Sequence, residues 1–337
     1  MMRRWSALLA LSAALSAPTL AAEYTITTLA PAPGFTGVQL FGINNSGQAV
    51  GTYISDMLGV TQPFIYGSGG TITPFSGPAS ALAASALGIS DGGVVVGSFF
   101  ETTVVDPATG DTVAGPSKGF ILDGGAFTIV DLGSGTSTEL RGISPDGRRV
   151  SGYYQDDTGV QLGFVLDRVT GTVTNVSAPG SLFTIAQGIN ANGVVGGSDV
   201  VPTAPGVVVR SGFTYDLVSG VRTTYSFDGY TRTAVRDVSD SGVLAGWLQS
   251  ADGTVVGFVG GPGSFQTLTV GGASNTTIQS MNESGWLVGN IVLDDGTPLG
   301  FVAVPVPEPT TALMLALGAA AVVVTQRRRA AGQAART

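Results

Sequence analysis

GINNSGQAVG at residues 42–51 decides the fold, because its pattern recurs six times along the 337-residue chain. The copies begin at residues 42, 88, 142, 188, 237 and 280. Most read Gly-Ile-Asn/Ser, two residues, Gly, a few apolar residues and Gly, and the third copy, 142–151, has Ser151 at its last position. Asn and Ser cap tight turns and Gly accepts a positive φ, so each copy predicts a turn followed by a buried strand.

A phenylalanine follows every copy and marks a second strand. Glycine precedes it in five units, and Pro63 takes that place in the first. The six markers are Phe64, Phe120, Phe164, Phe213, Phe258 and Phe301. A Thr-rich strand follows most of them, so a unit of about 47 residues holds four short strands, which is the size of a propeller blade.

The sixth unit lacks its Thr-rich strand, because the chain runs from Phe301 directly into Val304-Pro305. The segment YTITTL at 24–29 has the missing pattern. An N-terminal strand that completes the last unit would remove two sheet edges. We therefore predict an all-β fold, a six-bladed β-propeller over residues 23–304 closed by this strand. A β-solenoid, which would need capping units, is the alternative. The longest interval is expected to contain a long loop at 101–117.

Composition excludes several functions. The chain has no His and no Cys, which removes Ser-His-Asp and Cys-His nucleophile systems and the usual zinc sites. Residues 23–308 contain all 23 carboxylates and nine basic residues, a net charge of −14. Such a domain repels phosphate backbones, so we expect no nucleic-acid partner.

Both ends have the composition of export signals. Residues 1–22 combine a basic start at Arg3 and Arg4, an apolar run and a small-residue cleavage region, as a signal peptide does. At the other end, a Pro-rich linker at 305–311 precedes a short apolar segment at 312–326 and a basic tail at 327–337. The segment predicts a short transmembrane helix whose arginines stay in the cytoplasm, inserted transiently.

The C-terminal arrangement resembles the PEP-CTERM sorting signal of Gram-negative bacteria. The resemblance rests on the sorting residues Val306, Pro307, Glu308, Pro309, Arg327, Arg328 and Arg329. It implies a membrane cysteine protease, an exosortase, as processing partner. It also implies passage through the inner membrane and release or attachment at the cell surface, often in species that make exopolysaccharide.

The repeats themselves resemble the HAF repeat of bacterial extracellular proteins. The Gly-Ile-Asn-x-x-Gly core matches, but the His-Ala of that motif is absent and only Phe remains in each unit. The resemblance implies an extracellular repeat architecture and no particular activity.

One polar residue recurs in every turn and forms a candidate ligand-facing ring. Its members are Asn44, Ser90, Ser144, Asn190, Ser239 and Asn282. Capping of their own turns is the other interpretation, and the one that repetition favours. Aspartates at 156–157, 240, 252 and 294–295 could supply a carboxylate pair or bind Ca²⁺, although solvated hairpin turns are the favoured explanation for them. We expect no other cofactor.

These observations predict a non-catalytic, exported protein of the cell surface or extracellular matrix. It would bind or scaffold exopolysaccharide or other envelope material. Two alternatives stay open: a polysaccharide-active hydrolase or lyase that uses paired Asp residues, and a passive structural spacer.

Overall fold

The computed structural model describes residues 23–55, 61–106, 108–133, 135–204, 207–261 and 263–306. A compact unit, Tyr24–Pro305, is separate from a second unit formed by Met1–Glu23 and Val306–Thr337. The described ranges contain strands and turns and no α-helix, so none of their elements is a helix able to cross a membrane. The predicted signal peptide at 1–22, the predicted helix at 312–326 and the predicted basic tail at 327–337 lie outside the described residues.

The strands form four-stranded antiparallel groups, which we call sheets 1 to 6. Sheet 1 contains β2 (Gly37–Ile43), β3 (Ala49–Ile54), β4 (Thr61–Tyr66) and β5 (Ile72–Pro74). Sheet 2 contains β6 (Ala83–Ile89), β7 (Val95–Phe100), β10 (Ser117–Asp123) and β11 (Ala126–Val130). Sheet 3 contains β12 (Thr138–Ile143), β13 (Arg149–Gln155), β14 (Gln161–Asp167) and β15 (Val173–Asn175).

The second half repeats this plan. Sheet 4 contains β16 (Phe183–Ile189), β17 (Val194–Ala204), β18 (Val207–Asp216) and β19 (Arg222–Tyr225). Sheet 5 contains β20 (Arg232–Val238), β21 (Leu244–Gln249), β22 (Val255–Gly261) and β23 (Ser264–Leu268). Sheet 6 contains β24 (Ala273–Met281), β25 (Leu287–Leu293), β26 (Pro298–Pro305) and β1 (Tyr24–Thr28).

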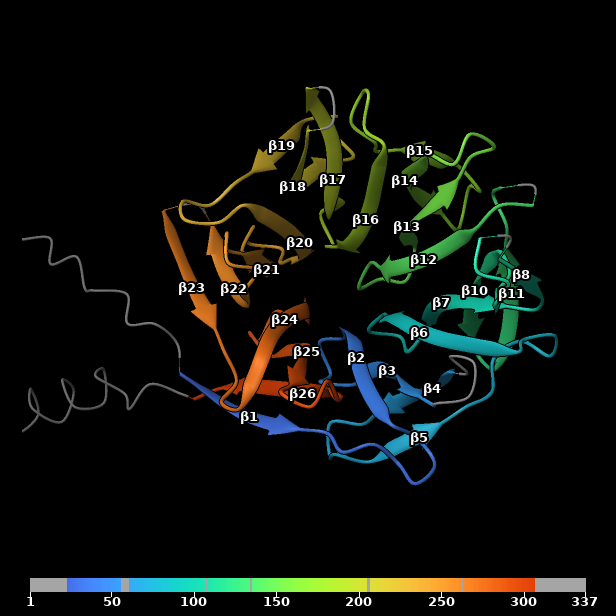
Figure 1. Cartoon of the computed structure of the whole chain (residues 1–337), viewed down its shortest axis with the longest axis horizontal. Helices are drawn as coiled ribbons and strands as arrows, with labels where there is room; N and C mark the ends of the chain where they lie inside the picture. The colour runs from blue at the N-terminus through green and yellow to red at the C-terminus, as the bar shows by residue number, and fades with distance from the viewer. Residues whose placement is uncertain are drawn as a thin grey trace, which may run out of the picture. The chain divides into compact units, whose positions relative to one another are not determined.

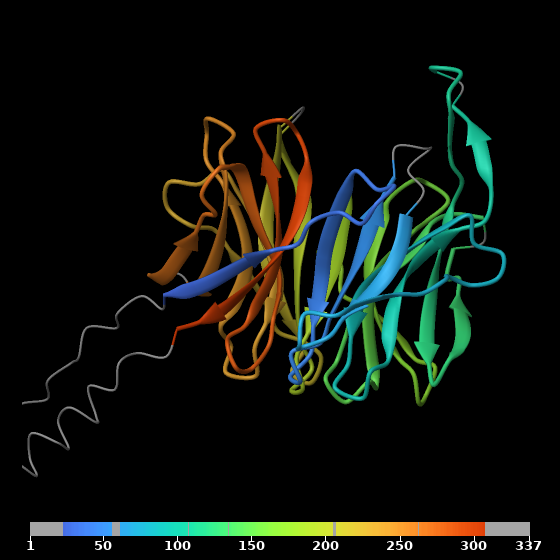
Figure 2. The ribbon, with the colours of Figure 1, turned by 90° about the horizontal axis from the view of Figure 1, so that it is seen from below.

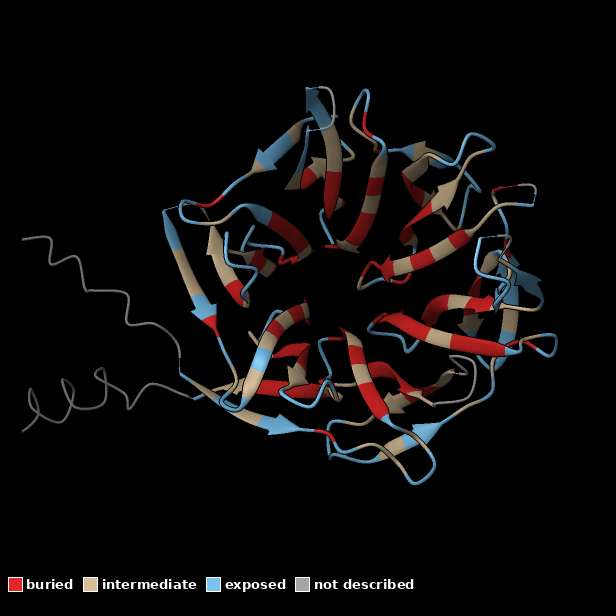
Figure 3. Cartoon of the chain, viewed as in Figure 1, coloured by how far each residue is buried: buried red, intermediate tan, exposed pale blue. Residues whose placement is uncertain are grey.

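The sheets of the unit Tyr24–Pro305 succeed one another around a common centre, with the first strand of each sheet innermost (Figure 1). Single parallel pairs, such as Gln161↔Phe183, join sheets 3 to 6 in sequence. Buried residues concentrate on the inner strands and exposed ones on the outer strands (Figure 3). This radial arrangement confirms the predicted all-β, β-propeller class and favours it over the solenoid.

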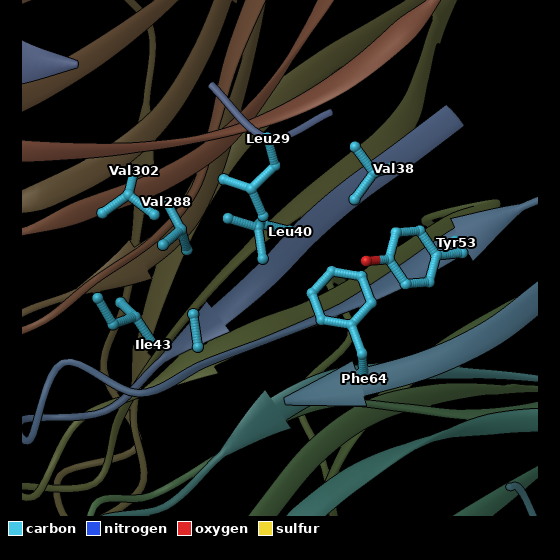
Figure 4. Packing of buried hydrophobic residues seen from close by; sticks show 9 residues of the cluster. Leu29, Val38, Leu40, Ile43, Tyr53, Phe64, Val288 and Val302 are labelled. Atoms are coloured by element: carbon cyan, nitrogen blue, oxygen red, sulfur yellow. The ribbon is translucent and has the colours of Figure 1, made fainter. Parts of the chain in front are cut away.

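Sheet 6 is completed by the N-terminal strand, as the sequence predicts. β1 pairs antiparallel with β26 from Tyr24↔Pro305 to Thr28↔Phe301, and the two strands lie side by side in Figure 2. An apolar cluster beside this pair joins sheet 6 to sheet 1: it contains Val288 and Val302 of sheet 6 together with Leu40 of sheet 1 (Figure 4). The last sheet therefore needs both ends of the unit.

The six marker phenylalanines are fully buried, each on the third strand of its sheet. Each stands opposite a glycine of the second strand, as Phe120 does opposite Gly97. A Cβ atom at Gly97 would overlap the carbonyl oxygen of Ser85 and lie 2.8 Å from the Phe120 ring. The glycine therefore makes room for the aromatic ring within the sheet.

The third repeat departs from the predicted alignment. The residue opposite Phe164 is Gly152, whereas the repeat pattern has Ser151 at the position that glycine takes in the other copies. The Ser144 N–H donates to the carbonyl of Arg149, five residues on, whereas Asn44 donates to Gln48, four residues on. One extra residue in this turn thus absorbs the shift and keeps glycine opposite phenylalanine.

The prediction of a long loop at 101–117 is also wrong in detail. It contains a hairpin of its own, β8 (Thr103–Val105) paired with β9 (Thr112–Ala114). The hairpin projects from sheet 2 (Figure 2) and leaves Val104, Val105 and Val113 exposed. Alternating β-branched residues on both sides of a turn explain why this insertion folds as strands.

Candidate functional site: a central cavity

Each innermost strand contains a β-bulge just before the repeated turn. The pairing register shifts there in every sheet, for example between Leu40 and Gly42 in sheet 1. The residues at the bulges, which we call the bulge residues, are Phe41, Leu87, Arg141, Gln187, Arg236 and Gln279. A bulge commonly re-aims a side chain near a functional site.

Glycines bring the innermost strands close together directly after the bulges. A Cβ atom on Gly42 would lie 2.9 Å from the Cα atom of Gly88, and one on Gly88 would lie 3.1 Å from that of Gly142. Sheets 5 and 6 have Asp237 and Ser280 at this position. The repeat therefore changes from glycine to polar residues on one side of the centre.

A cavity lies at the centre of the unit. Its volume, measured as the space that the centres of water molecules can occupy, is about 70 Å³. All six bulge residues line it, together with Asp237, Ser280 and residues of the repeated turns. About 10–15 Å³ of such space holds one water, so the cavity suits a group of a few heavy atoms. Among the bulge residues, those of sheets 1 and 2 are apolar, Phe41 and Leu87, and those of sheets 3 to 6 are polar.

Arg141 is held in place by its own strand. Its Nη2 atom lies 2.6 Å from Oε2 of Glu139, and its guanidinium carbon lies 5.7 Å from the centre of the Tyr153 ring. Burial is the largest single influence and lowers the pKa of Arg141, but Glu139 and Tyr153 together outweigh it, so the pKa of Arg141 is raised. The Nε atom of Arg141 is buried and has no hydrogen-bond partner among the described residues.

Arg236 is different, because its guanidinium has neither a hydrogen bond nor an ion pair among the described residues. Burial, and after it the positive charges of Arg141 and Arg210, lower its pKa to about 9. The side chain stays charged at neutral pH. A buried, unpaired cation beside another cation is costly for the fold and marks a candidate functional residue.

Among the cavity-lining residues that directly follow a bulge residue, Asp237 alone carries a carboxylate. Its Oδ2 atom accepts hydrogen bonds from Ser280 Oγ at 2.6 Å and from the Met281 N–H at 2.9 Å. Burial raises the pKa of this carboxyl to about 6, although these hydrogen bonds oppose the rise. Asp237 therefore titrates just below neutral pH.

The predicted ring residues are all buried and cap their own turns. The Oδ1 atom of Asn44 accepts hydrogen bonds from the N–H groups of Ser46 and Gln48. The hydroxyl oxygen of Ser90 accepts a hydrogen bond from the N–H of Val94. The three asparagines also reach the next sheet: Asn44 donates to Ser90 O, Asn190 to Ser239 O and Asn282 to Asn44 O. Ser144 and Ser239 accept an N–H of their own turns. A ligand-facing role for the ring stays a prediction.

The residues that follow the ring form a second circle of hydrogen bonds, which we call the belt. Asn45 N–H donates to Asp91 Oδ1 at 2.9 Å, and Asp240 N–H donates to Glu283 Oε1 at 2.8 Å. The belt continues through Glu283 N–H to Asn45, Ala191 N–H to Asp240, and Asp91 N–H to the Pro145 carbonyl. Between sheets 3 and 4 it is interrupted, because Pro145 has no N–H.

The hairpin aspartates accept hydrogen bonds from their own turns. Asp156 Oδ1 accepts the N–H groups of Thr158 and Val160, and Asp295 Oδ1 accepts that of Thr297. The Thr158 hydroxyl and these N–H groups lower the pKa of Asp156, and the Thr297 N–H lowers that of Asp295. In the described part of the chain, no three acidic residues are grouped as a metal site would need.

The bulge residues and the belt were not found by sequence reasoning. Their signal was available, since each bulge residue stands one position before a repeat. Its residue type changes from unit to unit while its neighbours repeat. A variable position inside a regular repeat was therefore the feature that could have located the cavity.

Comparison with protein families identifies the C-terminus. Residues 305–329 match the PEP-CTERM protein-sorting motif. Of the sorting residues, Val306 is described and exposed, and the others lie beyond the described part. The motif confirms the predicted resemblance and implies an exported protein that an exosortase processes at the cell envelope. No match is found among curated protein sequences.

Solved structures share the fold at low identity. A protein of unknown function from Dyadobacter fermentans is 10% identical with a TM-score of 0.51, covering 83% of this chain and 98% of that one. TolB from Acinetobacter baumannii is 13% identical with a TM-score of 0.49 over 80% of this chain, which spans 64% of that protein's length. The β-propeller domain of the Trilobed protease from Pyrococcus furiosus is 10% identical with a TM-score of 0.46, over 79% and 95% of the two chains.

Proposed function

We propose that this exported chain, which carries a PEP-CTERM sorting motif, is a closed six-bladed β-propeller that binds exopolysaccharide or other envelope material. It acts without catalysis at the surface or in the extracellular matrix of a Gram-negative cell. Sheets 1 to 6 are its blades, and the HAF-like repeats are their sequence counterpart. The pairing of β1 with β26 supports ring closure.

The observation that carries the binding role is the change of residue type around the central cavity. The turns, the glycine–phenylalanine pairs and the belt repeat because each sheet needs them to fold. The bulge residues do not repeat, and they place Arg141, Gln187, Arg236 and Gln279 on one side of the cavity. A structural spacer has no need for a buried cation without a partner, whereas a ligand site does.

A binding assay tests this function. The exported protein, purified from the cell surface or medium, is applied to immobilised exopolysaccharide of the producing strain and to unrelated neutral glycans. We expect retention by the former and no release of sugar from it. Failure to retain any envelope polysaccharide would refute the binding role. Release of shorter sugars would instead support the hydrolase or lyase alternative.

The sorting role has an independent test. Replacing Arg327, Arg328 and Arg329 by Gln should leave an unprocessed form in the membrane fraction, because the basic cluster fixes the orientation of the apolar segment. Mass spectrometry of the parent protein gives both cleavage sites and any group attached to the new C-terminus. Unchanged processing of the triple variant would contradict exosortase recognition through this cluster.

A further inference from the structure

We propose that the central cavity is an oxyanion site that takes the carboxylate of an acidic sugar residue, bound chiefly by Arg236. This inference rests on the proposed function and specifies the chemical class of its ligand.

Charge gives the first argument. The domain is strongly acidic, yet two of its nine non-terminal cations line one small cavity. Glu139 neutralises Arg141, so the charge of Arg236 is left without a counter-ion among the described residues. Guanidinium groups pair with carboxylates through two parallel N–H donors, which is the strongest polar contact a neutral-pH site can offer a small anion.

The remaining cavity wall fits a sugar better than a bare inorganic anion. The amide of Gln187 makes no hydrogen bond with a described residue, and that of Gln279 bonds Thr277 Oγ1 at 3.2 Å. A side-chain amide can both donate a hydrogen bond to a hydroxyl group and accept one from it. Phe41 and Leu87 provide an apolar surface on the opposite side. An apolar wall with a few convergent polar groups is the usual composition of a small-molecule site.

The acidic groups near the site are already engaged. Asp91, which also lines the cavity, accepts Asn45 N–H at 2.9 Å and Asn45 Nδ2 at 3.0 Å. Asp237 accepts from Ser280 and Met281. Glu283 accepts Asp240 N–H in the belt. These donors partly offset the carboxylate charges, and the cavity is small, so one anionic group and not a polymer segment enters it.

Thermal shift and calorimetric titration of the exported protein test the proposal. The probes are D-glucuronate, D-glucose and inorganic phosphate, each at matched ionic strength. We expect saturable binding of glucuronate, weaker binding of phosphate and none of glucose. Tighter binding of phosphate than of glucuronate would overturn the acidic-sugar assignment, and absence of glucuronate binding would overturn the site.

Arg236→Gln is the decisive variant, because Gln already occupies the same bulge in sheets 4 and 6. Losing a charge-assisted contact should weaken glucuronate binding about tenfold to a hundredfold. Its unfolding temperature without ligand should equal or exceed that of the parent. The matched control, Arg232→Gln, removes an exposed charge from the same strand and should bind as the parent does. Equal binding by Arg236→Gln and the parent would refute the proposal.

The polymer assay separates this site from the wider function. If Arg236→Gln loses glucuronate binding but retains exopolysaccharide, the site is supported and the polymer is held mainly elsewhere. If the parent binds glucuronate but retains no polymer, the site stands and the proposed function fails.

Discussion

Asp237 is the residue whose charge state matters most for the fold. Because its pKa is raised from 3.8 to about 6 by burial, the folded protein holds this proton more tightly than the unfolded chain does. The resulting stabilisation is complete below the unfolded pKa and is lost as the pH rises through about 6. With a shift near two pH units, it amounts to about 3 kcal/mol.

Asp237→Asn should therefore flatten the pH dependence of stability between pH 4 and 7. The measurement is urea unfolding of parent and variant across that range, and the difference in unfolding free energy should change by up to about 3 kcal/mol. Asp228→Asn, at an exposed turn residue, is the control, and its unfolding free energy should depend on pH as that of the parent does. A parallel curve for Asp237→Asn as well would contradict the burial argument.

Gly97→Ala should destabilise the protein by roughly 1–3 kcal/mol, because the added methyl group meets the Phe120 ring and a backbone carbonyl. Denaturant midpoints measure the effect. Gly69→Ala provides the matched control, since nothing lies within 4 Å of a Cβ there and its φ is not in the left-handed region. Equal midpoints for the two variants would show that the sheet accommodates the methyl group.

At the scale of the turns, Asn282 has two separable roles. Its Oδ1 atom accepts the N–H groups of Ser284 and Trp286, and its Nδ2 atom donates to Asn44 O of sheet 1 at 3.1 Å. Asn282→Ser, the residue of sheets 2, 3 and 5, should keep the cap and lose the contact between sheets, at a cost of about 1 kcal/mol. Asn282→Ala should lose both and cost about twice as much.

Ser90→Ala is the comparison for that series, since Ser90 caps its turn through Val94 N–H and its side chain makes no hydrogen bond to a described residue of the next sheet. Unfolding free energies from urea titrations should rank the parent first, then Asn282→Ser, then Asn282→Ala. An Asn282→Ser variant as destabilised as Asn282→Ala would indicate that the contact between the sheets alone matters, or that Ser does not form the cap.

How far the sequence predicts these elements depends on repetition. The turns recur every 43 to 54 residues and a phenylalanine follows each of them, so both were visible in a single chain. The extra residue in the turn after Ser144 was not, because Ser151 and Gly152 can both follow an apolar residue and only pairing with Phe164 distinguishes them. The bulge before each turn has no fixed residue type, so the cavity lining required the fold. The belt required it too, because its bonds join residues 43 to 54 positions apart, or 238 where it closes.

For the whole unit, the strand β1 decides whether the ring closes. Removing residues 24–28 from the mature chain would expose the edge of β26 and part of the apolar cluster at Val302 and Leu40. We expect a clear fall in unfolding temperature and self-association detectable by light scattering, because an unpaired hydrophobic edge recruits other chains. Adding a synthetic peptide of sequence YTITTL should reverse both effects, and a scrambled peptide should not. An unchanged unfolding temperature would contradict a closing role.

The pairing of β1 with β26 also sets an order in time. β1 is synthesised and exported before β26. It therefore stays unpaired until nearly all of the chain between the two strands has crossed the membrane. Contacts so distant in sequence form slowly, after the local hairpins of the other sheets. Until that moment sheet 6 lacks its outer strand and the ring is open. Completion of the fold thus requires export of the chain as far as Pro305, the residue at which the sorting motif begins.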